Sequence, residues 1–378
     1  MKLEISSSSL YKKITMLAGV INAKPLVAIL EDFLFSVKDN VLSITASDLQ
    51  TTITTKMKVQ NADDFSIAIP SRILLDTLKN LSNQNIVIIA EENGNNITIK
   101  SDFGEYVIAG HNANEFPTIT LDNNYENQFI FSGKKLKRAL QTCFPISSND
   151  ALKPVLNSIY FDFIDKELIC VSTDIHRLVK YEIVDENIEQ AKSIIVPKKS
   201  VQQLINLIDD DENLQITNYN GRVCFYLHEG ETQIIASTIS EKFPSYDTVI
   251  PHNYENIMTI YRLDLVASLK RLMIYTNAVS HQIQFSIENN KLTILAEEVN
   301  CGNMAVETIP CSYRGTQPMS IMFNVKILLD LLQNIDFDEI TFKFSDVDEN
   351  GKSNKAVVIS PNSGDDEKIT SLVMPIYS

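Results

Sequence analysis

The chain repeats one pattern three times at a period of 127 residues, and this repeat constrains its fold more than any other feature. In each copy, an apolar β-pattern is closed by one residue and followed by apolar residues at helical spacing. The closing residues are 127 apart in both steps: Pro70, Pro197 and Asn324. A second marker, Phe116-Pro117, returns 127 residues later as Phe243-Pro244, and Met374-Pro375 takes the same place near the end. A period this long exceeds that of solenoid repeats and indicates repeated domains.

Each copy begins with a helical stretch, continues with two alternating apolar runs joined by turn-forming residues, and ends with a helix and a second hairpin signal. The six predicted helices span residues 8–20, 71–81, 133–144, 198–208, 262–275 and 325–334. The predicted turns are Lys38-Asp39-Asn40, Ile164-Asp165-Lys166, Glu288-Asn289-Asn290, Asn93-Gly94, Asn220-Gly221 and Asn350-Gly351. We therefore predict an α+β fold of three tandem domains, 1–122, 126–251 and 255–378, each with two helices on antiparallel sheets, joined by short polar linkers such as 122–124.

Charge is distributed unevenly along the chain. The 378 residues include 33 Lys and Arg against 48 Asp and Glu, a net charge of −15 that by itself argues against nucleic acid. However, the six predicted helices hold 14 of the basic residues and only three of the acidic ones, and no Glu. Ordinary solvated helix faces usually interleave Glu and Lys four residues apart. The pattern therefore favours a basic helical surface that contacts a phosphate backbone without sequence preference.

The sequence indicates a soluble cytoplasmic protein, because its first residues show no basic-then-apolar signal segment and no apolar run approaches the roughly 20 residues that span a bilayer. Five cysteines, an odd number without a CxxC pair, are expected to be reduced packing residues.

Three motifs, read together, carry a resemblance to a known family. They are Thr173-Asp174-Ile175-His176-Arg177-Leu178, Phe243-Pro244-Ser245-Tyr246 and the ending Leu372-Val373-Met374-Pro375-Ile376, and Lys24-Pro25-Leu26 adds a fourth. With the three-domain repeat, they resemble the bacterial DNA sliding clamp, the β subunit of DNA polymerase III. The resemblance implies a head-to-tail homodimer that forms a six-domain ring around duplex DNA and keeps a polymerase on its template.

The resemblance also implies which residues contact DNA and which bind partners. The expected DNA-contacting residues are Lys24, Arg72, Lys134, Lys135, Lys137, Arg138, Lys153, Lys198, Lys199 and Lys270. The implied pocket would take short linear motifs of the replicative polymerase, the clamp loader, other polymerases and repair proteins, with Leu and Phe as anchors and a polar Gln. Its expected wall is Leu156, Thr173, His176, Arg177, Leu178, Pro244, Val249, Leu372, Val373, Met374, Pro375 and Ile376. Core packing is the alternative role for Leu156, Leu178 and Val249.

At the implied subunit interface, Tyr106 and Ile108 of one copy would meet the partner's Ile274 and the partner's Tyr275. The sequence departs from the family at several of these places. Ile175 replaces a Gly, Thr248 stands where an Arg is frequent, and Tyr377-Ser378 replaces an Arg-Leu ending. The acidic cluster of the third domain is reduced to Glu297 and Glu298.

No catalytic constellation is found, and we expect no enzyme activity, metal or cofactor. Asp346–Gly351 begins like a calcium loop but has Val357 where a bidentate Glu is required. The run Asp209–Glu212 could bind a cation or act as a solvated cap after a helix, and the remaining histidines show no ligand spacing. Two alternatives stay open: a monomeric acidic adaptor that binds peptides without encircling DNA, and a hydrolase that uses His176, which lies close in sequence to Asp174 and Cys170.

Overall fold

The structure is a computed structural model that describes residues 1–91, 96–119, 121, 125–164, 166–185, 188–298, 301–315, 317–345, 355–361 and 367–376. The chain divides into two compact units, described separately below. The first contains Met1–Lys137 and Gln202–Thr238, and the second contains Arg138–Val201 and Ile239–Ser378. Within the described residues, no helix combines the length and apolar character needed to cross a membrane.

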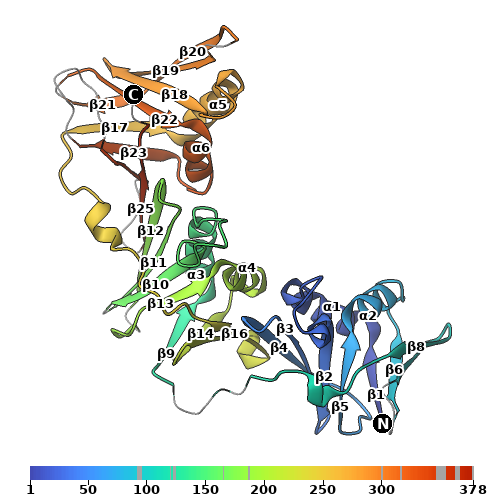
Figure 1. Cartoon of the computed structure of the whole chain (residues 1–378). Helices are drawn as coiled ribbons and strands as arrows, with labels where there is room; N and C mark the ends of the chain where they lie inside the picture. Colours follow the sequence, from blue (N-terminus) through green and yellow to red (C-terminus); the bar gives the residue numbers. More distant parts are fainter. Residues whose placement is uncertain are drawn as a thin grey trace. The chain divides into compact units, whose positions relative to one another are not determined.

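All six predicted helices are present, within a few residues of their expected ends (Figure 1). They are α1 Ser7–Leu17, α2 Ser71–Lys79, α3 Gly133–Cys143, α4 Lys198–Leu207, α5 Arg262–Leu272 and α6 Val325–Gln333. Short 3₁₀ turns extend two of them, η1 Ala18–Val20 after α1 and η6 Met273–Tyr275 after α5. Local chemistry explains the starts: the Ser6 side chain accepts the Ser9 N–H, and the Asn324 side chain accepts those of Lys326 and Ile327.

The first unit holds two antiparallel sheets. The four-stranded sheet has the order β1 Lys2–Ser6, β6 Asn85–Ala90, β7 Asn96–Lys100 and β8 Glu105–Ala109. The eight-stranded sheet has the order β5 Phe65–Pro70, β2 Asp32–Lys38, β3 Val41–Ser47, β4 Thr51–Lys58, β16 Thr232–Ser237, β15 Arg222–Leu227, β14 Asn213–Tyr219 and β9 Asn127–Ser132. Helix α1 packs against α2 and against strands of both sheets, so Leu10 and Ile14 are fully buried.

The second unit repeats this plan. Its nine-stranded sheet has the order β13 Ile194–Pro197, β10 Ser158–Ile164, β11 Glu167–Thr173, β12 Arg177–Val184, β25 Glu367–Val373, β24 Val357–Pro361, β23 Glu339–Phe344, β17 Asn256–Tyr261 and β21 Ser312–Arg314. Its four-stranded sheet has the order β20 Asn303–Pro310, β19 Lys291–Glu298, β18 Gln282–Glu288 and β22 Met319–Asn324. Helices α5 and α6 pack together, and Leu269, Leu328 and Leu332 are fully buried.

Two ladders extend the sheets across the expected domain limits. Strand β4 pairs with β16 in the first unit, and β12 pairs with β25 in the second. Each sheet of the expected central domain thus continues into a sheet of its neighbour. These ladders explain why the chain forms two compact units, whose boundaries fall inside α3 and α4, whereas the sequence repeat divides the chain into three domains. The three-domain limits remain a prediction from the repeat.

The predicted hairpins form where the structure describes them. The two-residue turn between β2 and β3 is Asp39-Asn40, and that between β18 and β19 is Asn289-Asn290, with all four residues at positive φ. This is the type I′ geometry that matches the twist of the flanking strands. The predicted turns Asn93-Gly94 and Asn350-Gly351, the linker 122–124 and the calcium-like run 346–351 lie outside the described residues.

Candidate partner-binding site and basic helix faces

The end of the chain is anchored by backbone hydrogen bonds. In the β12–β25 ladder, Leu178 lies opposite Leu372 and Arg177 opposite Val373. Beyond the ladder, the Met374 N–H donates to the His176 carbonyl at 2.9 Å, and the Ile376 N–H donates to the Met322 carbonyl at 2.8 Å. These bonds hold an apolar tail against the second unit where an unattached tail would fray.

An apolar cluster lies beside this tail. Its buried members are Ile169, Val171, Leu178, Ile195, Phe243, Tyr246 and Leu372, and half-buried Val155, Tyr160, Ile239, Ile250, Ala356 and Met374 pack against it. The rings of Tyr160 and Phe243 stack with centroids 4.7 Å apart. The Tyr246 hydroxyl donates to the Asp162 carboxylate at 3.0 Å, which fixes that ring. Burial raises the pKa of the Tyr246 hydroxyl, so it remains a donor.

The predicted pocket residues fall into two groups by exposure. Those that present surface are Leu156, His176, Pro244, Val249, Met374 and Ile376, and those buried beneath are Thr173, Arg177, Leu178, Leu372, Val373 and Pro375. The buried group supplies a floor, and the exposed group supplies a rim that is apolar apart from His176 and in which Val249 is 52% exposed. Sequence reasoning missed Val155 and Tyr160, which carry no motif. Phe243 and Tyr246 were recognised from the sequence as parts of a family motif but were not assigned to the pocket.

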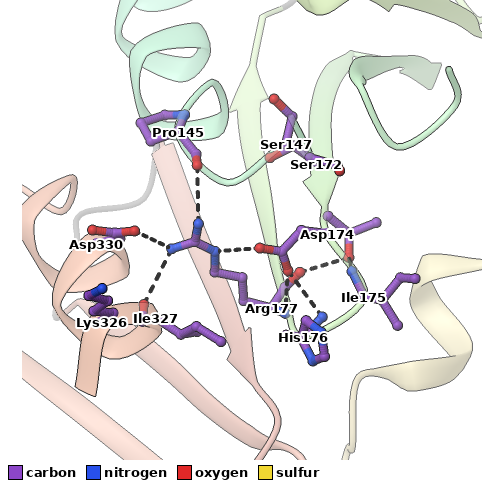
Figure 2. Close-up of polar contacts among 12 residues, drawn as sticks. Pro145, Ser147, Ser172, Asp174, Ile175, His176, Arg177, Lys326, Ile327 and Asp330 are labelled. Atoms are coloured by element: carbon purple, nitrogen blue, oxygen red, sulfur yellow. Dashed lines mark hydrogen bonds and ion pairs between the residues drawn. The ribbon is translucent and has the colours of Figure 1, made fainter. Parts of the chain in front are cut away.

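Arg177 is held on all sides and is only 8% exposed (Figure 2). Its Nε donates to Asp174 Oδ2 at 2.9 Å, and one terminal nitrogen donates to Asp330 Oδ2 at 3.2 Å and to the Ile327 carbonyl at 3.4 Å. The other terminal nitrogen donates to the Pro145 carbonyl at 3.3 Å. A guanidinium whose donors are used this fully positions the loop and strand of the pocket, and has little capacity left to contact a bound peptide.

The Asp174 loop keeps a glycine-like backbone although Ile replaces Gly. Ile175 adopts φ 83°, a region that a β-branched side chain rarely enters. The turn is fixed by its neighbours, because Asp174 Oδ1 accepts the N–H groups of His176 and Arg177, both at 3.0 Å. The Thr173 hydroxyl donates to the Arg177 carbonyl at 2.7 Å. Ile175 therefore occupies a left-handed position in this loop, and its side chain is 61% exposed at the rim.

Cys170 is poorly placed to act as a nucleophile with His176. Cys170 is fully buried in β11, whereas His176 is exposed on the loop that follows. Burial raises the pKa of the Cys170 thiol well above its usual value, which disfavours the nucleophilic thiolate.

Lys198 differs from the other residues expected to contact DNA. It is 9% exposed, and its ammonium donates to the Ser147 carbonyl at 2.7 Å and to Asn149 Oδ1 at 2.9 Å. Burial lowers the pKa of this ammonium, with a further lowering from the Arg177 charge. Lys198 thus supports the start of the loop that carries Lys153, and we leave it out of the DNA-contacting set proposed below.

The other expected DNA-contacting residues carry accessible surface. Lys24, Arg72, Lys134, Lys153 and Lys270 are exposed, and Lys135, Lys137, Arg138 and Lys199 are half-buried. Two of the α3 cations already have acidic partners, since Lys137 contacts Asp210 at 2.8 Å and Arg138 contacts Glu367 at 3.0 Å. Such pairs hold a side chain in place but cost little to exchange for a phosphate partner.

The residues expected at the subunit interface lie on or beside the edge strands β8 and β20. Tyr106 is half-buried, and Ile274 and Tyr275 in η6 are 79% and 43% exposed. Ile108 is only 3% exposed because it points into the core of its own unit, whereas its neighbour Val107 is 65% exposed. Strand alternation decides which residue faces outward, and the sequence pattern alone did not reveal that phase.

A groove of about 540 Å³ lies beside β8 in the first unit. Its wall includes Ile73, Leu81 and Tyr106, with Arg72 and Asp76 among its polar members. Because Ile73 is 48% exposed, this is an open apolar surface next to an unpaired strand edge.

Comparison with known proteins gives one consistent result. Three family profiles match in tandem: "DNA polymerase III beta subunit, N-terminal domain" over residues 1–120, "central domain" over 131–245 and "C-terminal domain" over 247–377. The "Beta sliding clamp" of Haemophilus influenzae is 27% identical over 92% of this chain and 93% of its own length. That of Vibrio cholerae is 26% identical over the full length of both chains.

Solved structures agree with the sequence comparisons. The sliding clamp of Pseudomonas aeruginosa bound to griselimycin superposes with a TM-score of 0.92 at 25% identity, and both chains are fully covered. Another structure of the DNA polymerase sliding clamp from that organism gives a TM-score of 0.90 at 26% identity. The three-domain repeat, the anchored apolar tail and these matches over the whole chain lead to one assignment: the chain belongs to the family of DNA polymerase III beta subunits, the bacterial sliding clamps.

Proposed function

We propose that this chain is a processivity clamp of the bacterial cytoplasm, without catalytic activity of its own. Two copies close head to tail into a ring around duplex DNA. The ring then holds the replicative polymerase, the clamp loader, other polymerases and repair proteins through the pocket beside the tail. The observation that carries the ring is the order in which the repeated strands pair.

Each half of a repeat ends in an equivalent strand. Among the described residues, only two of these strands, β8 and β20, are paired on one side alone. In the first half of the first repeat the final strand is β4, which pairs with β16 of the second; in the first half of the second it is β12, which pairs with β25 of the third. In the third repeat the strand equivalent to β4 and β12 is β20, and the remaining strand equivalent to β16 and β25 is β8, in the first repeat. A second copy that supplies β8 to β20 completes the series and covers both edges.

The repeat also gives the register of this proposed ladder. The pairs nearest the preceding hairpin turn are Ser47–Thr52 and Glu298–Asn303, so Met304 is equivalent to Ile53. Likewise, the pairs Leu227–Thr232 and Lys100–Glu105 make Val107 equivalent to Ile234. Ile53 lies opposite Ile234, and both are fully buried. Val107 and Met304 are 65% and 61% exposed, as expected for a pair that a second copy would bury.

The groove beside β8 fits the same arrangement. The 3₁₀ turn η6 contacts β20, so a copy that pairs its β20 with β8 brings its own η6 toward the groove lined by Ile73, Leu81 and Tyr106. Ile274 is an exposed side chain, and the partner's Ile274 is a suitable occupant of this groove. Burying a side chain of this size contributes about 1.5–3 kcal/mol. The proposed interface set is therefore Tyr106, Val107, Ile274, Tyr275 and Met304, with Ile108 in the supporting core.

The charge distribution suits nonspecific contact with DNA. The six observed helices carry 14 Lys and Arg and only Asp76, Asp264 and Asp330 as acids. We propose Lys24, Arg72, Lys134, Lys135, Lys137, Arg138, Lys153, Lys199 and Lys270 as the contacting residues. Phosphate contacts carry no sequence information, so a ring that holds DNA by enclosure can slide on it.

Retention on circular and linear DNA tests the proposal. The chain would be loaded onto nicked circular plasmid with a bacterial clamp loader, freed of unbound protein by gel filtration, and divided into an untreated and a linearised sample. We expect retention on the circle and loss after linearisation, because a ring slides off free ends. Equal retention on both would contradict topological binding. A monomer at micromolar concentration in sedimentation would favour the acidic adaptor.

A further inference from the structure

Three side chains with metal-binding groups meet at the end of α4 in the first unit. Asp209 follows that helix, Glu212 precedes β14, and His228 begins η4 His228–Gly230 between β15 and β16. His228 Nε2 lies 3.3 Å from Asp209 Oδ2 and 4.0 Å from Glu212 Oε1. The three ligand atoms lie within 4.8 Å of one another. The sequence indicated only the acidic run, because the imidazole arrives from a turn 16 residues later.

Glu212 and His228, the two less exposed members of the cluster, are held in place by hydrogen bonds to neighbouring backbone and side-chain groups. Glu212 Oε2 accepts the His228 backbone N–H at 2.6 Å, and Glu212 Oε1 accepts the Asp209 backbone N–H at 2.9 Å. His228 Nδ1 lies 3.0 Å from the hydroxyl of Thr232, which is fully buried and lies 3.1 Å from the Thr55 hydroxyl. This contact orients the ring so that Nε2 faces the carboxylates. Metal-ligating histidines and carboxylates are commonly positioned by such hydrogen bonds.

The exposure of the cluster suits an ion that enters from solvent. The side chains of Glu212 and His228 are 14% and 19% exposed, whereas Asp209 is 75% exposed and leaves one side open. His228 and the next residue, Glu229, have φ of 52° and 54°. Two successive non-glycine residues in this region cost conformational energy, and here the strained turn brings the imidazole to the carboxylates.

We propose that Asp209, Glu212 and His228 bind a divalent transition metal ion of the zinc class, with water completing the coordination. One imidazole and two carboxylates match the ligand preferences of zinc, whereas calcium requires six to eight oxygen ligands. The 3.3 Å separation of His228 Nε2 and Asp209 Oδ2 fits one edge of a tetrahedron with bonds of about 2.0 Å. The site is independent of ring closure and of the partner pocket.

The neighbouring Asp210 provides a matched control. Its carboxylate contacts Lys137 Nζ at 2.8 Å, outside the cluster, and this contact lowers the pKa of Asp210. A bound ion would join the end of α4 to the β15–β16 turn. It would therefore raise the melting temperature of the chain, increasingly so as the free ion concentration exceeds the dissociation constant.

The test is calorimetric titration of the full-length, chelator-treated protein with Zn²⁺ alone, together with thermal unfolding and the absorption spectrum of Co²⁺. We expect one saturable site per chain that is retained in Asp210→Asn. In His228→Asn, affinity should fall by at least about tenfold, and the Zn²⁺-dependent rise in melting temperature should shrink accordingly. Asn suits position 228 because it tolerates positive φ.

Asp209→Asn is a second variant at an exposed position, so it reports on the site even if the His228 variant does not fold. Binding weakened by either variant but not by Asp210→Asn supports the site. Wild-type protein without saturable binding at millimolar Zn²⁺ would overturn it, and so would unchanged affinity in both variants. The cluster would then be an ion pair between His228 and two carboxylates.

Discussion

At the scale of single residues, Ile175 carries a conformational cost that its neighbours impose. Its φ of 83° is fixed by hydrogen bonds of Thr173 and Asp174, and its side chain is 61% exposed, so little packing compensates. A left-handed conformation costs an L-residue roughly 1–2 kcal/mol, and glycine avoids that cost while losing about 0.5–1 kcal/mol in unfolded-state entropy. We expect Ile175→Gly to raise the free energy of unfolding of the second unit by up to about 1 kcal/mol in urea titration. Ile175→Val should show no gain, and a Gly variant less stable than wild type would contradict the assigned strain.

Loss of Arg177 should destabilise the fold far more than loss of its exposed partner Asp330. The side chain of Asp174 is 20% exposed and that of Asp330 is 57% exposed. Removing one member of a buried pair costs about 3–5 kcal/mol, whereas an exposed pair contributes about 0–1 kcal/mol. We therefore expect Arg177→Ala to destabilise by about 3 kcal/mol and Asp330→Asn by less than about 1 kcal/mol. Urea unfolding of both variants and of the double variant measures this, and similar losses for the two single variants would contradict it.

These residues also mark how far the sequence could be read. The motif around Arg177 identified the family, but its assignment to the pocket rim did not reveal that its donors are used internally. Those contacts come from Pro145 and Asp330, which lie 32 and 153 residues away along the chain, and no local pattern encodes them. The internal contacts of Lys198 were not visible from the sequence for the same reason. Its position at the start of a helix suggests solvent, but Ser147 and Asn149 enclose its ammonium.

At the scale of secondary-structure elements, helices and hairpins were predictable because their signals are local. Apolar spacing placed all six helices, and turn residues placed the hairpins at Asp39-Asn40 and Asn289-Asn290. The pairing of β4 with β16 and of β12 with β25 was not visible, because strand alternation gives the buried face of a strand but not its neighbour. The burial of Ile108 was not visible for the same reason, because alternation does not reveal whether Val107 or Ile108 faces the core.

The tail after β25 is an element whose role can be tested by removal. Met374 packs against the apolar cluster, and its N–H and that of Ile376 anchor the segment. We expect deletion of 374–378 to reduce affinity for a labelled peptide with Gln, Leu and Phe anchors by at least about tenfold, because one wall of the pocket is lost. The dimer should persist, since β8, β20 and η6 are untouched. Deletion of 377–378 alone is the control, and unchanged peptide affinity after the longer deletion would contradict the pocket.

At the scale of the whole molecule, the proposed ring completes the series of strand pairings between successive repeats. Two of the three pairings form within the chain, and the third requires a second copy. The two junctions within the chain are sheet ladders, and the residues equivalent to the buried pair Ile53–Ile234 are the exposed Met304 and Val107. Acidic residues outside the helices then serve a purpose that net charge alone concealed. In the proposed ring they would discourage DNA from binding elsewhere, while the basic helices would accept it.

A disulfide tests this register directly. Lys56 donates to the Glu231 carbonyl and Ser237 to the Gln50 carbonyl, so the alternation of the ladder makes Ile53–Ile234 a pair without mutual hydrogen bonds. Such pairs have the closer side chains, and we expect the same of Val107 and the partner's Met304. The double variant Val107→Cys with Met304→Cys should form covalent dimers on mild oxidation, seen by non-reducing electrophoresis. The background should carry Cys301→Ser, because Cys301 is exposed close to Met304.

The control for this cross-linking experiment places the two cysteines at diagonal rather than directly opposite positions of the proposed β8–β20 ladder. Glu105 is equivalent to Thr232 and would face Val306, so Glu105→Cys with Met304→Cys separates the thiols along the ladder. Diagonal neighbours lie about 7–8 Å apart, whereas a disulfide requires Cβ atoms about 3.5–4.5 Å apart. Rapid cross-linking of the 107–304 pair with slow cross-linking of the 105–304 pair is the expected result. The reverse order would place the ladder in another register. Absence of dimer in both would mean that β8 and β20 do not meet, and the ring would need a different closure.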